Sequence, residues 1–128
     1  MQHDPVDRWY TLLMLTDAVE VWLIGWTPGQ GTAPHDHGGA AGAFTVTAGT
    51  LTEEVFDGGG RIAVRRPFAA GATRSFGANH VHRVRSEGPV DAISIHAYSP
   101  PNRPMRHYAA TARGWSPRLA GAPEAAVR

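Results

Sequence analysis

Short apolar segments follow one another along most of this chain, and turns that contain glycine and proline separate them. Segments rich in apolar, β-branched and aromatic residues cover residues 10–15, 19–26, 43–48, 50–56, 61–66, 71–76, 80–85 and 90–98. Residues 28–31 and 57–60 have the composition of tight turns. About eight short strands at a spacing of roughly 8 to 12 residues are typical of an antiparallel sandwich or barrel. The sequence therefore predicts an all-β fold, with no convincing helix before Met105.

The chain is long enough for one hydrophobic core. Its 128 residues and 42% hydrophobic content fit a single packed domain, which we expect to span residues 1–113. Residues 114–128 are rich in alanine, proline and glycine, and we expect a flexible C-terminal tail there. The absence of cysteine excludes a disulfide scaffold, a thiolate metal site and a cysteine nucleophile.

Charge and hydropathy exclude several classes of partner. The 12 basic residues, all arginine, balance 11 acidic ones and form no basic stripe that would bind nucleic acid. The longest apolar stretch, residues 21–26, is too short to cross a bilayer. Residues 1–8 lack the apolar centre of a signal peptide. We expect a cytoplasmic protein without nucleic-acid or membrane partners, present as a monomer or weak dimer.

The most informative segment is a histidine pair that follows a glycine-containing turn. If residues 29–37 enter a strand, His35 and His37 point to one face, because side chains two residues apart share a face. A third imidazole must come from another strand, and either His80 or His82 supplies it. His96 lies on the next predicted strand. Neutral imidazole suits Fe, Zn, Cu or Ni, so the pattern predicts a metal site without selecting the metal.

Three polar residues alternate along the predicted strand 90–98. Ser94, His96 and Tyr98 have i, i+2, i+4 spacing and should face the same side. The serine hydroxyl can then orient the imidazole, and the imidazole can orient the phenol. The spacing predicts a hydrogen-bonded relay, and the alternative is a buried hydrogen-bonded strand without a catalytic role.

The glycine and histidine spacing resembles the first cupin motif. Gly29, the pair His35 and His37, and Gly49 stand at the spacing of that motif, but Gly42 occupies the place of the glutamate ligand found in most cupins. This departure resembles the thiol dioxygenases, which are cysteine dioxygenase and its relatives. Residues 82–84 (HRV) and 94–101 (SIHAYSPP) are similar to the third-ligand segment and the signature of that family. The resemblance runs from about residue 9 to residue 108 and implies a cupin domain, a jelly-roll-like double-stranded β-helix barrel.

By position, the resemblance implies that His35, His37 and His82 hold one Fe(II), with His80 as the alternative third ligand. It also implies that Ser94, His96 and Tyr98 form the catalytic relay. The implied activity is the addition of both atoms of dioxygen to the sulfur of a small thiol. Cysteine is the first expected substrate and a mercaptopropionate-like thiol the next. Animal cysteine dioxygenases link a cysteine to the relay tyrosine. Gly42 stands at that place, so we expect Tyr98 to be unmodified.

The residue that binds the substrate carboxylate departs from the family pattern. The family's arginine follows a Tyr-Thr pair on an early strand, and aligning Tyr10 and Thr11 puts Leu12 there. We therefore expect Arg106 or Arg8 to take this role, because the planar guanidinium matches a carboxylate.

Two other classes of protein remain open from the sequence. One is a non-catalytic metal-binding cupin that senses or buffers a small ligand. The other is a different cupin enzyme, such as a Zn or Mn isomerase or a dioxygenase of diketones or aromatic acids. The missing glutamate ligand and the relay of Ser94, His96 and Tyr98 argue against the second class.

Overall fold

The computed structural model describes residues 8–111 and 114–118. These residues form strands and no helix, so they contain no helix long and apolar enough to cross a membrane. The strands are β1 (Trp9–Leu15), β2 (Glu20–Trp26), β3 (Ala41–Ala48), β4 (Thr50–Phe56), β5 (Ile62–Ala69), β6 (Thr73–Phe76), β7 (His82–Arg85), β8 (Ala92–Ser99), β9 (His107–Thr111) and β10 (Gly114–Arg118).

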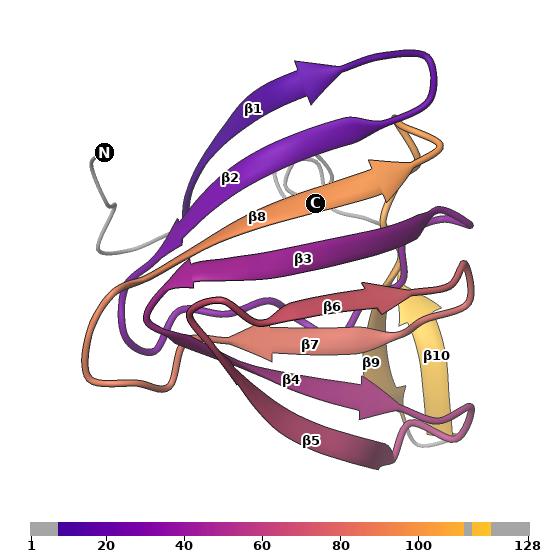
Figure 1. Ribbon diagram of the computed structural model, residues 1–128. Helices are drawn as coiled ribbons and strands as arrows, with labels where there is room; N and C mark the ends of the chain where they lie inside the picture. Colours follow the sequence, from indigo (N-terminus) through magenta and orange to yellow (C-terminus); the bar gives the residue numbers. More distant parts are fainter. Residues whose placement is uncertain (1–7, 112–113, 119–128) are drawn as a thin grey trace.

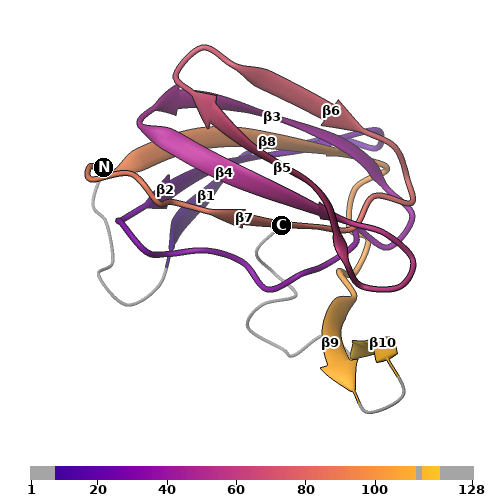
Figure 2. The same ribbon diagram turned by 90° about the horizontal axis from the view of Figure 1, so that it is seen from below.

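The strands form two facing sheets in which all neighbours are antiparallel (Figure 1). One sheet has the order β1-β2-β8-β3-β6 and the other has the order β5-β4-β7. The strands β9 and β10 pair with each other and lie apart from these two layers (Figure 2). The prediction of an all-β fold is confirmed.

The C-terminal part of the described chain contains a strand pair. The sequence predicted a flexible tail from residue 114, but Gly114–Arg118 forms β10 and pairs along its length with β9. A pairing between two segments poor in strand-forming residues depends on their being brought together, which composition does not reveal. Residues 119–128 lie outside the described residues, and the domain boundary at residue 113 stays a prediction.

The segment that carries the histidine pair is not a regular strand. Residues 31–37 make only isolated bridges, from Gly31 to Arg85 and from His35 to both His82 and His107. Pro34 lies inside this segment and has no N–H to donate to a continuous ladder. The expected strand is therefore wrong, although the segment still runs beside β7.

The core fills the space between the two sheets. It consists of Ile24, Trp26, Phe44, Val46 and Ala92 from the larger sheet, and of Leu51, Phe68 and Val84 from the smaller one. Burying a large apolar side chain of this kind stabilises a fold by roughly 1.5–3 kcal/mol. Gly49 lets the chain pass from β3 to β4, and so from one sheet to the other, because its φ of 71° is a conformation that favours glycine.

The central strand of the larger sheet, β8, is buried on one face only. Ala92, Ser94, His96 and Tyr98 are buried, while the residues between them are half-buried. The three polar residues of the predicted relay therefore share the inward face, as their spacing indicated.

Candidate metal centre

Three imidazoles meet inside the barrel from two separate parts of the chain. His35 and His82 exchange backbone hydrogen bonds of 2.9 and 3.0 Å, which fixes the histidine segment against the start of β7. His37 follows two residues after His35. The ring centroids of the three residues lie 4.7 to 4.9 Å apart. Their ligand nitrogens all lie within 4.8 Å of one another, so one ion can contact all three.

Hydrogen bonds determine which nitrogen each of two rings can offer to a metal. His35 Nδ1 lies 2.8 Å from the carbonyl oxygen of Ala33, and His82 Nδ1 lies 2.7 Å from Glu53 Oε2. A carbonyl and a carboxylate can only accept, so both Nδ1 atoms carry the proton and donate it. The lone pairs of His35 and His82 are therefore on Nε2.

His37 has no such partner. Both of its ring nitrogens are buried and make no hydrogen bond to the described residues. An imidazole without a partner in the interior is costly unless something coordinates it. This orphaned ring, next to two rings with free Nε2 lone pairs, fits a metal ion that has nitrogen ligands.

The same environment keeps the three rings neutral, as a metal requires. Burial lowers the pKa of His35, His37 and His82 below the usual value. Neighbouring histidines lower the pKa of His35 and His37 further, whereas Glu53 partly opposes the shift of His82. Metal binding then does not compete with protonation near neutral pH.

The buried carboxylate of Glu53 supports the third imidazole. It accepts hydrogen bonds from His82 Nδ1 at 2.7 Å, from His80 Nε2 at 2.9 Å and from Arg74 Nε at 2.8 Å. Burial raises the pKa of Glu53, but the hydrogen bonds from His80 and His82 outweigh this effect and hold that pKa well below its usual value. Such a carboxylate–histidine pair orients a metal ligand and raises its basicity. No sequence pattern indicated this role of Glu53.

The group of Glu53, His80 and His82 is a second set close enough to share an ion. The Arg74 guanidinium already forms an ion pair with this carboxylate at 2.8 Å, which disfavours another cation at the same place. The structure therefore brings together His35, His37 and His82, and it places His80 against Glu53. Their roles as metal ligands stay predictions.

The predicted relay lies beside this cluster as one hydrogen-bonded series. Ser94 Oγ is 2.8 Å from His96 Nε2, and His96 Nδ1 is 3.3 Å from Tyr98 Oη. The Tyr98 ring stacks on His37, with ring centroids 5.1 Å apart. The relay thus ends against one of the three clustered imidazoles.

Gly42 lies opposite Tyr98 on the neighbouring strand β3. A Cβ atom at this position would lie 2.9 Å from Tyr98 Cδ1 and 2.5 Å from Phe76 Cζ. The glycine thus leaves the space that the Tyr98 and Phe76 rings fill.

Neither of the two arginines expected to bind the substrate is among the residues that line the small pocket between the cluster and the loop after β8. Burial is the largest cause that lowers the pKa of His35 and His96, and the charge of Arg8 lies close enough to both to lower their pKa further. The side chain of Arg106 is 60% exposed and pairs with Asp36 at 2.8 Å. Burial raises the pKa of Asp36, but hydrogen bonds from Gly38, Arg106 and Tyr108 hold it below its usual value. The Arg8 guanidinium lies over the Trp26 indole, 5.2 Å from the ring centroid.

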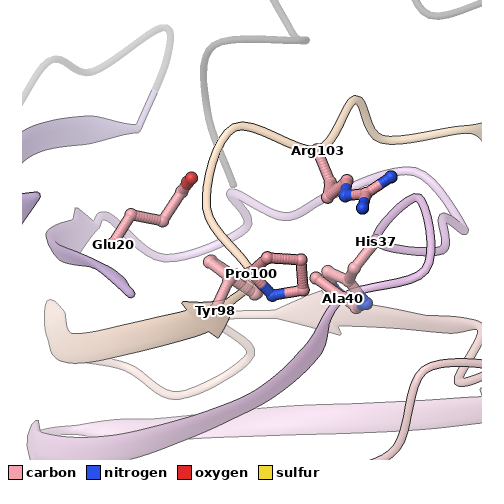
Figure 3. Close-up of a pocket in the computed structure, with 6 residues that line it drawn as sticks. All are labelled: Glu20, His37, Ala40, Tyr98, Pro100 and Arg103. Carbon is pink, nitrogen blue, oxygen red and sulfur yellow. The ribbon is translucent and has the colours of Figure 1, made fainter. Parts of the chain in front are cut away.

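A small pocket opens between the histidine cluster and the loop after β8 (Figure 3). His37, Ala40, Tyr98 and Pro100 form its inner wall, and Glu20 and Arg103 lie at its two sides. Arg103 is exposed, and its guanidinium lies on the same side as His37 in the close-up. It stands in a proline-containing loop without periodicity, so sequence reasoning missed it.

Solved structures share this arrangement of strands. An uncharacterised protein with a double-stranded β-helix domain from Klebsiella pneumoniae is 20% identical, with a TM-score of 0.70 over 81% of this chain and 86% of that chain. The TT1209 protein of Thermus thermophilus is 19% identical, with a TM-score of 0.68 over 78% and 90% of the two chains. Oxalate oxidase, solved with the substrate analogue glycolate, is 20% identical, with a TM-score of 0.68 over 80% of this chain and 55% of its own.

The two facing antiparallel sheets and the buried histidine cluster define a cupin with a possible metal site. The predicted double-stranded β-helix fold is confirmed by these structural relatives. The sequence profile of cysteine dioxygenase type I matches residues 4–111. The chain belongs to this family, as its two motifs indicated.

Proposed function

We propose that this protein is a non-haem iron thiol dioxygenase that converts a small thiol, with cysteine as the first choice, into its sulfinate. The observation that carries the proposal is the buried cluster of His35, His37 and His82, which contains no carboxylate ligand and adjoins a pocket lined by Tyr98. Iron held by three imidazoles would supply open neighbouring positions at which a thiolate and dioxygen meet.

The protein's own residues supply orientation, a proton and protection from water. Tyr98 lines the pocket next to His37, so its hydroxyl can stabilise negative charge that develops on oxygen or can lend a proton. Phe44 stacks on His96, with ring centroids 5.2 Å apart, and holds that ring inside the core. The core residues behind the relay keep bulk water away from these hydrogen bonds.

The proposal requires only a small thiol and dioxygen as partners. Free small thiols persist in a reducing compartment, so the proposal places the protein in the cytoplasm. A metal-binding cupin that senses a small ligand without turnover is the competing function, and the following experiment separates the two.

The test measures dioxygen consumption by iron-loaded protein. Cysteine or mercaptopropionate is added without air, oxygen is then admitted, and an oxygen electrode follows its uptake. We expect one dioxygen consumed per thiol and the sulfinate as the product. Bound iron with no uptake for either thiol would reject the enzyme and favour the sensor.

We further propose that Arg103 binds the substrate carboxylate, because it is the arginine among the residues that line the pocket. The Arg103→Gln variant should raise KM for cysteine and mercaptopropionate by about 10- to 100-fold, which corresponds to one charged hydrogen-bonding contact. Oxidation of cysteamine, which has no carboxylate, should hardly change. The measurement is a set of oxygen-uptake curves for the three thiols.

Three matched arginine variants serve as comparisons for Arg103→Gln. Arg66→Gln changes an exposed arginine on β5 and controls for the loss of positive charge. Arg106→Gln and Arg8→Gln test the two residues that the sequence indicated. A selective rise in KM for the carboxylate-bearing thiols in either of these two, with Arg103→Gln unaffected, would transfer the role to that residue.

A further inference from the structure

The buried hydrogen-bond series has a fourth member, Trp26 on β2. Trp26 Nε1 lies 2.9 Å from Ser94 Oγ, on the side of the serine away from Tyr98. All four residues of the series are at most 3% exposed, so bulk water does not reach their hydrogen bonds: Trp26, Ser94, His96 and Tyr98. The Arg8 guanidinium covers the indole ring from the other side.

The donor and acceptor properties of these four groups limit how protons can be arranged. An indole N–H can only donate, so Ser94 Oγ must accept from Trp26. Burial lowers the pKa of His96 to about 3, so its ring is neutral and has one protonated nitrogen. Either Nε2 carries this proton and faces Ser94, or Nδ1 carries it and faces Tyr98.

Each arrangement leaves one hydroxyl proton without an acceptor in the series. If His96 Nε2 carried the proton, Ser94 Oγ would accept from both Trp26 and His96. The serine hydrogen would then have no acceptor along the series, which is unfavourable for a fully buried hydroxyl. If Nδ1 carries the proton, Ser94 donates to His96 Nε2 and His96 donates to Tyr98 Oη. The proton left over is then that of Tyr98, which lines the pocket, where a bound ligand can accept it.

We propose that Trp26 is a positioning residue that biases the proton order of this relay, because its N–H keeps the serine hydrogen from pointing to that side and leaves His96 Nε2 as the acceptor for it in the series, with His96 Nδ1 then donating to Tyr98 Oη. Tyr98 then receives a hydrogen bond from His96 and does not use its own proton in that contact. The phenol proton is directed to the side of the pocket that Tyr98 and His37 line. The catalytic consequence rests on the proposed function, but the proton order does not.

The test determines which nitrogen of His96 is protonated. Protein with ¹⁵N-labelled histidines is loaded with zinc, which is diamagnetic, and the ring nitrogens are observed by NMR without any thiol. The wild type should show a protonated Nδ1 and an unprotonated Nε2 at His96. A protonated Nε2 in the wild type would overturn the proposal, and this result requires no variant.

A pair of tryptophan variants tests the cause of this proton order. Trp26→Phe removes the donor to Ser94, so both hydroxyl orientations become possible and His96 should show a mixture of its two tautomers. Trp22→Phe is the matched control, since Trp22 lies opposite His96 on β2 but donates its N–H to Glu20. An unchanged His96 pattern in folded Trp26→Phe, or an equal change in Trp22→Phe, would contradict the role of Trp26.

Oxygen uptake then measures the catalytic consequence. Trp26→Phe should lower kcat for thiol oxidation by about 10-fold, which is in the range for residues that orient a functional residue through a second residue. KM and iron content should not change. An unchanged kcat would remove this consequence. If iron-loaded wild type oxidises no thiol, the proposed function fails, while the zinc-protein NMR result still decides the proton order.

Discussion

Replacing His82 with alanine should leave the protein almost free of iron after purification. The substitution removes one of three clustered imidazoles, and the remaining pair of His35 and His37 comes from one segment. It also removes the ring that Glu53 orients by its 2.7 Å hydrogen bond. Two imidazoles on a segment without regular strand structure cannot enclose the ion, so we expect iron content to fall to near background.

The matched variant is His80→Ala. His80 has the same spacing pattern and touches the same carboxylate, but His82 and Arg74 still hold Glu53 in this variant. His80→Ala should therefore keep most of the iron. Metal analysis of the two purified proteins gives the comparison, and circular dichroism checks that both are folded. Iron retained in His82→Ala, or lost equally in both variants, would overturn the ligand assignment.

Replacing Tyr98 with phenylalanine should keep the iron and slow thiol oxidation by about 10- to 1,000-fold, the range for the loss of one positioned donor. The phenylalanine ring can keep the stack on His37, whose ring centroid lies 5.1 Å from that of Tyr98 in the wild type. The cluster of His35, His37 and His82 should therefore stay intact. The hydroxyl that His96 orients is lost, and with it the group placed to stabilise charge on oxygen. Single-turnover oxygen consumption measures the effect.

Tyr10→Phe is the control for the loss of a phenol hydroxyl. Tyr10 is 41% exposed on the edge strand β1, and its ring packs against Trp22 away from the clustered histidines. This variant should oxidise thiol at the wild-type rate. An unimpaired Tyr98→Phe with normal iron content would show that the relay has no part in the reaction.

The sequence predicted those features that depend on local periodicity. Eight strands occur close to their expected positions, and Ser94, His96 and Tyr98 share a face because residues alternate along β8. The meeting of His35 with His37 was also predicted, although by a strand that does not form. In that case the spacing of two residues correctly predicted that both imidazoles lie together, although the segment is not a regular strand.

Features that depend on packing between distant segments were not predictable. His80 and His82 lie two residues apart, so the sequence pattern does not tell which of them joins the cluster. His82 does so because it pairs with His35, which lies 47 positions earlier in the sequence. Glu53 lies on another strand, and nothing in its neighbourhood indicates that it would be buried beneath two histidines. Arg103 reaches the pocket from an irregular loop, where periodicity carries no information.

The glycine opposite Tyr98 has a consequence for how the position of the phenol is set. Because Gly42 offers no side-chain atom for a covalent bond, the Tyr98 ring is held by non-covalent contacts, among them those with His37, Phe76 and His96. A crosslink from residue 42 to the phenol is therefore excluded, so under the proposed function Tyr98 would need no such bond before its first turnover. The position of the Tyr98 ring is then set by folding alone.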